Sequence, residues 1–168
     1  EKARQFPGCR IALVAPTSAD ARDIMIEGES GILNISSPST RPIYEPSKRR
    51  VTWSNGSMAT LYSAEEPDRL RGPQHHFAWC DEIATWKHPE TWDMLLFGLR
   101  LGEKPKVVIT TTPRPVKIVK ELVKNPQCVV TRGTTYENLA NLSPSFISNI
   151  VGRYEGTRLG RQELNAEI

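Results

Sequence analysis

Two adjacent carboxylates, Asp81 and Glu82, end the otherwise apolar stretch HFAWC at residues 76–80. Like charges side by side repel, and burial penalises both, so a strand that ends this way needs a reason. In a parallel α/β sheet, ligands gather at the carboxyl ends of strands. There the first acid can hold Mg²⁺, directly or through water, and the second can polarise a water for attack on a phosphoryl group.

This apolar strand followed by Asp-Glu is the Walker B pattern of P-loop NTPases, in the branch where the trailing Glu82 is the base. The alternative is a strand that ends in an exposed acidic turn, since short apolar runs followed by two acids also arise by chance. The pattern alone leaves both interpretations open, and further elements are needed to decide.

A threonine run, Thr110 to Thr112, follows the apolar residues 107–109 and precedes Pro113. Hydroxyls at the carboxyl end of a strand can hydrogen-bond a γ-phosphate or its attacking water and so report whether that phosphate is present. A β-favouring run stopped by proline would have the same composition without any function. Its spacing, one strand–helix unit after the acids, predicts a strand beside theirs.

Two arginines, Arg69 and Arg71, lie just before the acid-bearing strand, next to the turn-forming Gly72-Pro73. A guanidinium on a loop near a nucleotide can neutralise transition-state charge, within one subunit or across a subunit boundary. Surface ion pairing with the acids of residues 65–68 is the alternative.

Four other groups of polar and aromatic residues have simpler explanations. His75 and His76 are expected at a turn, facing solvent or bonded to the backbone. The tryptophans, among them Trp79 and Trp86, are expected to pack in the core or at its rim. The basic residues 48–50 could contact DNA phosphates, although charges at the start of a hairpin are usually solvated. Arg153, Arg158 and Arg161 alternate with acids, which suggests a solvated helical face.

The elements that must position these residues follow from apolar runs and turn signals. Strands are expected at 9–16, 49–53, 57–63, 76–82, 106–112 and 128–132, and helices at 19–27, 90–101, 115–124 and 143–168. Asn55-Gly56 between the second and third of these strands is a strong hairpin signal. Strands separated by helices predict a mostly parallel sheet covered on both faces, with the hairpin as an antiparallel insertion or edge.

The bulk composition suits one α/β domain: 168 residues, 38% hydrophobic and 24% charged. The net charge of +3 is compatible with a polyanionic partner. No apolar run approaches the ~20 residues that span a bilayer, and no signal peptide opens the chain. Because the sequence starts at Glu1 and stops at Ile168 inside an expected helix, we expect a segment of a longer protein.

Taken together, LRGPQHHFAWCDEIATW (70–86), VVITTTPRP (107–115) and GRYEGTRLGRQELNAEI (152–168) resemble the ATPase domain of the large terminase subunit of tailed bacteriophages. The resemblance implies a P-loop NTPase-like (ASCE) sheet with a C-terminal helical lid. It makes Asp81 the Mg²⁺-site aspartate, Glu82 the catalytic base and Thr110, Thr111 and Thr112 the coupling motif. Arg71 matches the arginine finger in placement, with Arg69 as the other candidate.

The same resemblance implies partners and limits. It predicts ATP and Mg²⁺, double-stranded DNA, a portal protein and procapsid, a small terminase subunit and a ring of identical subunits in the host bacterial cytoplasm, without a membrane. It divides the chain into a partial ATPase core, residues 1–142, and a lid or linker segment, residues 143–168, that leads toward a nuclease domain.

The departure from the family is the phosphate-binding loop, because no GxxxxGK[ST] occurs in the sequence. The resemblance places that loop before Glu1, so the isolated segment is expected to hydrolyse ATP barely or not at all. Two other functions remain open from the sequence: the ATPase core of a helicase-like P-loop protein, and a non-catalytic module that binds DNA or a partner protein.

Overall fold

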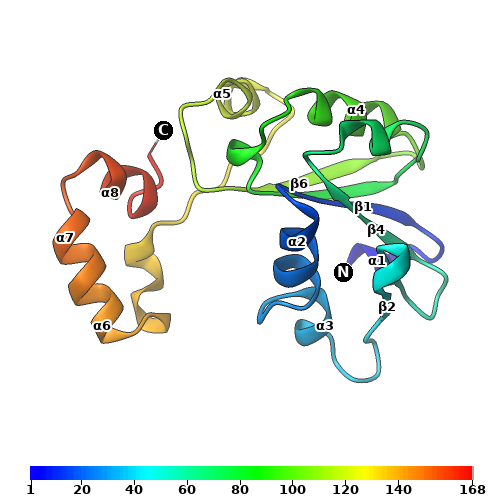
Figure 1. Ribbon diagram of the computed structural model, residues 1–168, viewed down its shortest axis with the longest axis horizontal. Coiled ribbons are helices and arrows are strands. Elements are labelled where there is room, and N and C mark those ends of the chain that lie inside the picture. Colours follow the sequence, from blue (N-terminus) through cyan, green and yellow to red (C-terminus); the bar gives the residue numbers. More distant parts are fainter. Residues whose placement is uncertain (168) are drawn as a thin grey trace. The chain divides into compact units, whose positions relative to one another are not determined.

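A six-stranded sheet forms the core of the N-terminal part of the protein in a computed structural model that describes residues 1–167 (Figure 1). The strand order is β2-β3-β4-β1-β5-β6. The strands are β1 (Arg10–Ala15), β2 (Ile43–Glu45), β3 (Arg50–Thr52), β4 (Met58–Ser63), β5 (Phe77–Asp81) and β6 (Lys106–Thr110). Five of them coincide with expected strands, and β2 is an addition.

The central strands are parallel, as the alternation of strands and helices predicts. β1 pairs in parallel with β4 on one side and β5 on the other, and β6 pairs in parallel with β5. Four consecutive residues of β1, Ala12 to Ala15, are buried, which confirms the expectation that this strand is covered on both faces. The parallel arrangement brings the carboxyl ends of β5 and β6 to one edge, where Asp81 is in register with Thr110.

The hairpin expected around Asn55-Gly56 is present. β3 and β4 are antiparallel, and Gly56 has a φ of 82°, which a glycine adopts without strain. The Asn55 side chain accepts a bond from the Ser57 N–H at 3.1 Å and donates to the Ala3 carbonyl at 2.8 Å, so it fixes the turn against α1 (Lys2–Gln5). β2 extends this antiparallel part by pairing with β3.

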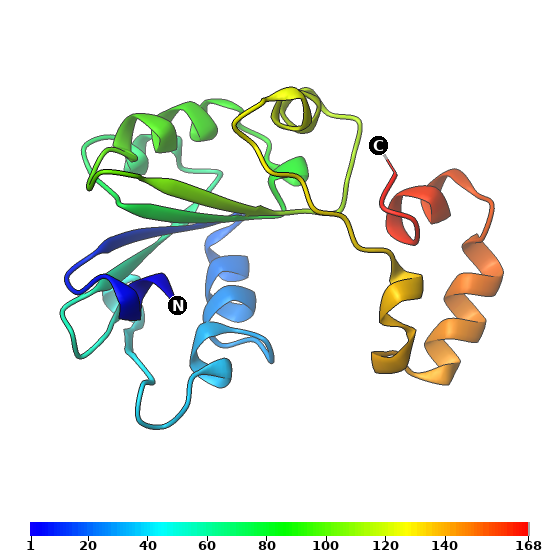
Figure 2. The ribbon, with the colours of Figure 1, turned by 180° about the vertical axis from the view of Figure 1, so that it is seen from behind.

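Helices cover both faces of the sheet (Figures 1 and 2). One face packs against α2 (Ser18–Asp20), the π-helical turn η1 (Ala21–Ile26) and α3 (Ile32–Ile35), through buried residues such as Met25 and Ile26. The other face packs against α4 (Glu90–Gly98) and the 3-10 turn η3 (Pro67–Leu70), through Leu95 and Leu70. Two further 3-10 turns are η2 (Pro46–Lys48) and η4 (Ile83–Thr85).

The chain divides into two compact units, Glu1–Thr110 and Thr111–Ile168. The first contains the whole sheet. The second contains α5 (Lys117–Lys124), η5 (Thr135–Asn141), α6 (Pro144–Phe146), η6 (Ile147–Val151), α7 (Gly152–Tyr154) and α8 (Arg158–Glu163). The helix expected from residue 143 onward is interrupted after α7, where Gly156 has a φ of 76°. The division into ATPase core and lid at residue 142 stays a prediction.

The strand expected at 128–132 is wrong. Residues 128–134 form neither helix nor strand, and the Val129 side chain is 91% exposed. β-branched residues favour strands, but a strand forms only when its backbone groups pair with a neighbour. None of the described strands pairs with this segment, so its propensity is not realised.

No helix among the described residues is both long and apolar enough to cross a membrane.

Candidate functional site

Asp81 is the last residue of β5, and its side chain meets β6 directly. The Thr110 hydroxyl donates to Asp81 Oδ1 at 2.6 Å. This contact follows from the register, because residues opposite each other in neighbouring strands project to the same face of the sheet. The prediction that the threonine strand lies beside the acid-bearing strand is therefore confirmed.

Two tryptophans complete the surroundings of Asp81. Trp79 Nε1 donates to Thr110 Oγ1 at 3.0 Å, so the hydroxyl accepts from the indole while it donates to the carboxylate. Trp86 Nε1 donates to the Asp81 carbonyl at 3.0 Å. The sequence analysis assigned both rings to packing and missed these bonds. The available signal was the strand alternation, which puts Trp79, two residues before Asp81, on the same face.

Glu82 has an unusual backbone conformation, with φ 49° and ψ 43°. This left-handed geometry costs a residue other than glycine about 1–2 kcal/mol. The Glu82 carbonyl stabilises it by accepting from the Thr85 N–H at 2.8 Å and the Thr85 hydroxyl at 2.7 Å. Residues held in such conformations cluster at active sites and ligand-binding sites. The turn sends the chain after Glu82 out of the strand direction, and both acids stay half-buried.

The remaining threonines, Thr111 and Thr112, follow β6 and belong to the second compact unit. Both are half-buried, and the Thr111 hydroxyl donates to the Thr112 carbonyl at 3.0 Å. Thr110 is the member of the run that bonds Asp81 directly.

Both candidate arginines lie on the surface and bind acids on their own turn. Arg71 Nε lies 2.7 Å from Asp68 Oδ1, and Arg69 Nε lies 3.5 Å from Glu66 Oε2. Arg71 keeps 66% of its side chain exposed, and Arg69 keeps 57%. Exposed pairs of this kind contribute at most about 1 kcal/mol, so either guanidinium can leave its partner for a stronger anion.

A family model described as "Terminase large subunit, T4likevirus-type, N-terminal" matches residues 5–168. The chain belongs to this terminase family. No curated protein sequence matches it.

Solved structures of large terminases share the fold. The large terminase ATPase domain of Thermus phage P74-26 has a TM-score of 0.69 at 17% identity, over 99% of this chain and 79% of that one. The large terminase of a thermophilic bacteriophage, in complex with ADP, has a TM-score of 0.75 at 14% identity, over 98% of this chain and 41% of that one. The same thermophilic phage protein in complex with ATP-γ-S gives 0.70 at 12% identity, with 99% and 41% covered.

The carboxylates of this terminase site determine which chemistry it can support. Asp81 offers a carboxylate at the end of β5, and Glu82 offers a second one beside it. No group of three or more His, Cys, Asp and Glu residues that could hold a metal occurs in residues 1–167. A cation here would therefore need water or ligand oxygens in addition to Asp81, which is how Mg²⁺ binds beside phosphates. Cys80 is buried, and burial raises the pKa of its thiol above the usual range, so it stays protonated.

Proposed function

We propose that this chain is part of an ATP-driven motor that packages double-stranded DNA into phage procapsids. The observation that supports this most strongly is the position of Asp81 and Glu82 at the carboxyl end of β5, with Asp81 bonded to Thr110 of the next strand at 2.6 Å. The terminase family match adds to it, as do the related structures of a large terminase from a thermophilic bacteriophage with ADP and ATP-γ-S.

In this proposal the two acids have different tasks. Asp81 would hold Mg²⁺, and the ion would supply positive charge to offset the negative charge of the phosphates. Glu82 accepts a proton from the water that attacks the γ-phosphorus, so that ADP and inorganic phosphate form. The bonds from Thr110 and Trp86 fix Asp81, while the left-handed backbone at Glu82 directs the second acid separately.

Thr110, Thr111 and Thr112 couple hydrolysis to DNA movement in this proposal. Thr110 bonds to the Mg²⁺-site aspartate, and the two residues after it begin the second unit. A change at the phosphate can therefore pass along the chain from one unit to the next. Arg71 acts as the arginine finger on the nucleotide of a neighbouring subunit, with Arg69 as the other candidate.

The further components of the motor come from the family. They are a portal protein and procapsid, a small terminase subunit and a homo-oligomeric ring in the host bacterial cytoplasm. The phosphate-binding loop and the nuclease domain lie outside these 168 residues, residues 1–142 form the partial ATPase core, and residues 143–168 form the lid. The isolated segment therefore hydrolyses ATP barely or not at all.

The test uses the complete large subunit with small subunit, procapsids and linear DNA. Glu82→Gln preserves the size of the side chain but removes its basicity. General-base catalysis contributes roughly 10²–10⁴-fold, so ATP hydrolysis and DNA packaging fall by at least ~100-fold. DNA binding stays unchanged.

The matched control is Glu65→Gln. Glu65 is also an acid that follows a parallel strand, but it forms an exposed ion pair with Lys87 at 3.0 Å. Its replacement leaves hydrolysis within about twofold of the wild type, because an exposed pair contributes little. Equal activity of the Glu82→Gln variant and the wild type would remove Glu82 from the mechanism.

A further inference from the structure

Helix α5, residues Lys117–Lys124, has one strongly basic side. Lys117, Lys120 and Lys124 are three, four and seven residues apart, so they project from the same side of the helix. The apolar residues of this helix lie on the opposite side, where Val119 is buried. The helix therefore separates its lysines cleanly from its apolar contacts.

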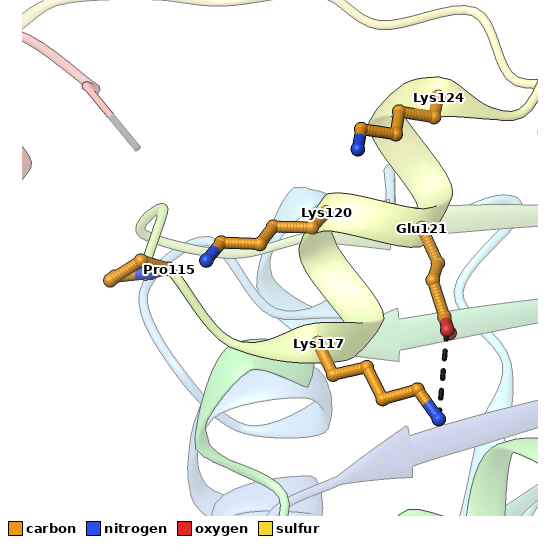
Figure 3. A pocket seen from close by; sticks show the side chains of 5 residues that line it. All are labelled: Pro115, Lys117, Lys120, Glu121 and Lys124. Atoms are coloured by element: carbon orange, nitrogen blue, oxygen red, sulfur yellow. Dashed lines mark ion pairs between the residues drawn. The ribbon is translucent and has the colours of Figure 1, made fainter.

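The lysines surround an open hollow of about 380 Å³, which Pro115 and Glu121 also line (Figure 3). Lys120 extends toward Pro115, whereas Lys117 turns toward Glu121. The Lys117–Glu121 pair is 3.7 Å long, with 89% and 63% of the two side chains exposed, so water screens it strongly. Neither Lys120 nor Lys124 has an ion pair within the described part of the chain.

The basic residues 48–50, which the sequence also suggested for DNA contact, are different. Lys48 and Arg50 both bind Glu45, at 2.5 and 3.0 Å, and Arg49 binds Glu66 at 2.9 Å. Two acids of the same protein, Glu45 and Glu66, thus offset most of the charge of this cluster. On α5, Lys117 has a weak partner in Glu121, whereas Lys120 and Lys124 have no ion pair among the described residues.

The surrounding sequence adds to the positive charge. Residues 111–132 contain five Lys and Arg residues and a single acid, Glu121. The basic residues are Arg114, Lys117, Lys120, Lys124 and Arg132. Cations that outnumber the neighbouring acids in this way attract a polyanion and release its counterions.

We infer that the basic side of α5 (Lys117, Lys120 and Lys124) binds the phosphate backbone of double-stranded DNA. This inference rests on the proposed packaging function, which requires the motor to bind DNA of any sequence. At 1.5 Å per residue, Lys117 and Lys124 lie roughly 10 Å apart along the helix, about three times the ~3.4 Å rise along the duplex axis between successive phosphates of one strand. Lysine ammonium groups on flexible stems act as point charges that contact phosphates without reading bases.

The test is Lys120→Gln/Lys124→Gln in the complete large subunit, with binding of a mixed-sequence DNA duplex measured over a series of salt concentrations. Each lost phosphate contact reduces the slope of log K against log[salt] by ~0.9, so the slope becomes shallower by about 1.8 and affinity at low salt falls roughly tenfold or more. Lys120→Arg/Lys124→Arg keeps the charge and restores the slope. Lys48→Gln/Arg50→Gln removes two cations that are already paired and leaves the slope unchanged.

ATP hydrolysis without DNA separates this inference from the proposed function. It stays at the wild-type rate in the α5 variant, because the two lysines are not part of the acid-pair site. If the wild-type protein shows no Glu82-dependent hydrolysis but the slope still changes, the motor proposal fails while the DNA surface stands. A wild-type slope in the glutamine variant overturns the inference. Loss of procapsid binding with DNA binding intact also overturns it and identifies an acidic protein as the occupant.

Discussion

Polar side chains near the two ends of β5 differ in burial and in hydrogen bonding. At the carboxyl end, Asp81 is half-buried and bonded to Thr110. At the amino end, His75 is only 3% exposed, and neither ring nitrogen has a hydrogen-bond partner among the described residues. The His75 ring packs edge-on against Tyr62, with the ring centroids 5.6 Å apart.

This difference indicates that the carboxyl end of β5 is the better candidate for ligand binding. Burial, together with the neighbouring His76, lowers the pKa of His75 to about 4, so the imidazole is neutral and acts as a packing group. Asp81 instead has a donor that suits a carboxylate and remains accessible to an ion. A buried polar group without hydrogen-bond partners, such as His75, lowers the free energy of unfolding. A carboxylate held by hydrogen bonds, such as Asp81, is oriented to bind a ligand.

The largest expected effect at the carboxyl end comes from Asp81→Asn, which keeps the shape but removes the negative charge. If Asp81 holds Mg²⁺ as proposed, its loss as a ligand removes several kcal/mol of transition-state stabilisation, so hydrolysis by the complete large subunit falls by at least about 100-fold. When hydrolysis is measured against Mg²⁺ concentration, the variant reaches half of its maximal rate at a higher Mg²⁺ concentration than the wild type. Asp93→Asn, on the exposed side of α4, serves as the control and keeps the wild-type Mg²⁺ curve.

The amino end predicts a dependence of stability on pH. Because the folded pKa of His75 is about 4 and the unfolded value is about 6.5, the unfolded chain binds more protons between these values. The free energy of unfolding therefore falls as the pH drops from about 6.5 to about 4, by up to ~3 kcal/mol from this residue. Denaturant unfolding at several pH values measures the slope.

His75→Phe removes the titrating group and keeps a ring beside Tyr62. Its unfolding free energy should change less over the same pH range than that of the wild type. An identical pH slope in both proteins would show that His75 is solvated, and the contrast between the two ends of β5 would disappear.

The smallest effect is expected for Thr110→Val, which deletes the hydroxyl between Trp79 and Asp81. Thr110 is exposed, so the free energy of unfolding falls by only about 1 kcal/mol. The activation free energy of hydrolysis changes by more than the free energy of unfolding, because Asp81 loses the bond that orients it. Trp79→Phe removes the indole donor but leaves the Asp81–Thr110 bond, so its activity lies between those of Thr110→Val and the wild type.

Local patterns were sufficient to predict five of the six strands and the contact between Asp81 and the threonine run at Thr110. Strand alternation, the Asn55-Gly56 turn and the order of strands and helices determined these features. The left-handed conformation of Glu82 has no sequence signal, because glycine or asparagine usually marks such positions.

The other differences depend on contacts between distant residues. The indole bonds of Trp79 and Trp86, the burial of His75 and the failure of 128–132 to form a strand each depend on which segments become neighbours. Likewise, the basic residues 48–50 and the lysines of α5 look alike in sequence. The positions of Glu45 and Glu66 pair every cation of the first cluster, whereas on α5 Lys117 alone has an ion pair among the described residues.

The most direct test of the separate tasks of the two acids is a single-turnover measurement with radiolabelled ATP on the complete large subunit carrying Glu82→Gln. The variant should bind ATP with Mg²⁺ at close to wild-type affinity, because Asp81 and its bonds to Thr110 and Trp86 are intact, and the bound ATP should remain unhydrolysed. Cleavage of the bound ATP at the wild-type rate would contradict the assignment of Glu82 as the base.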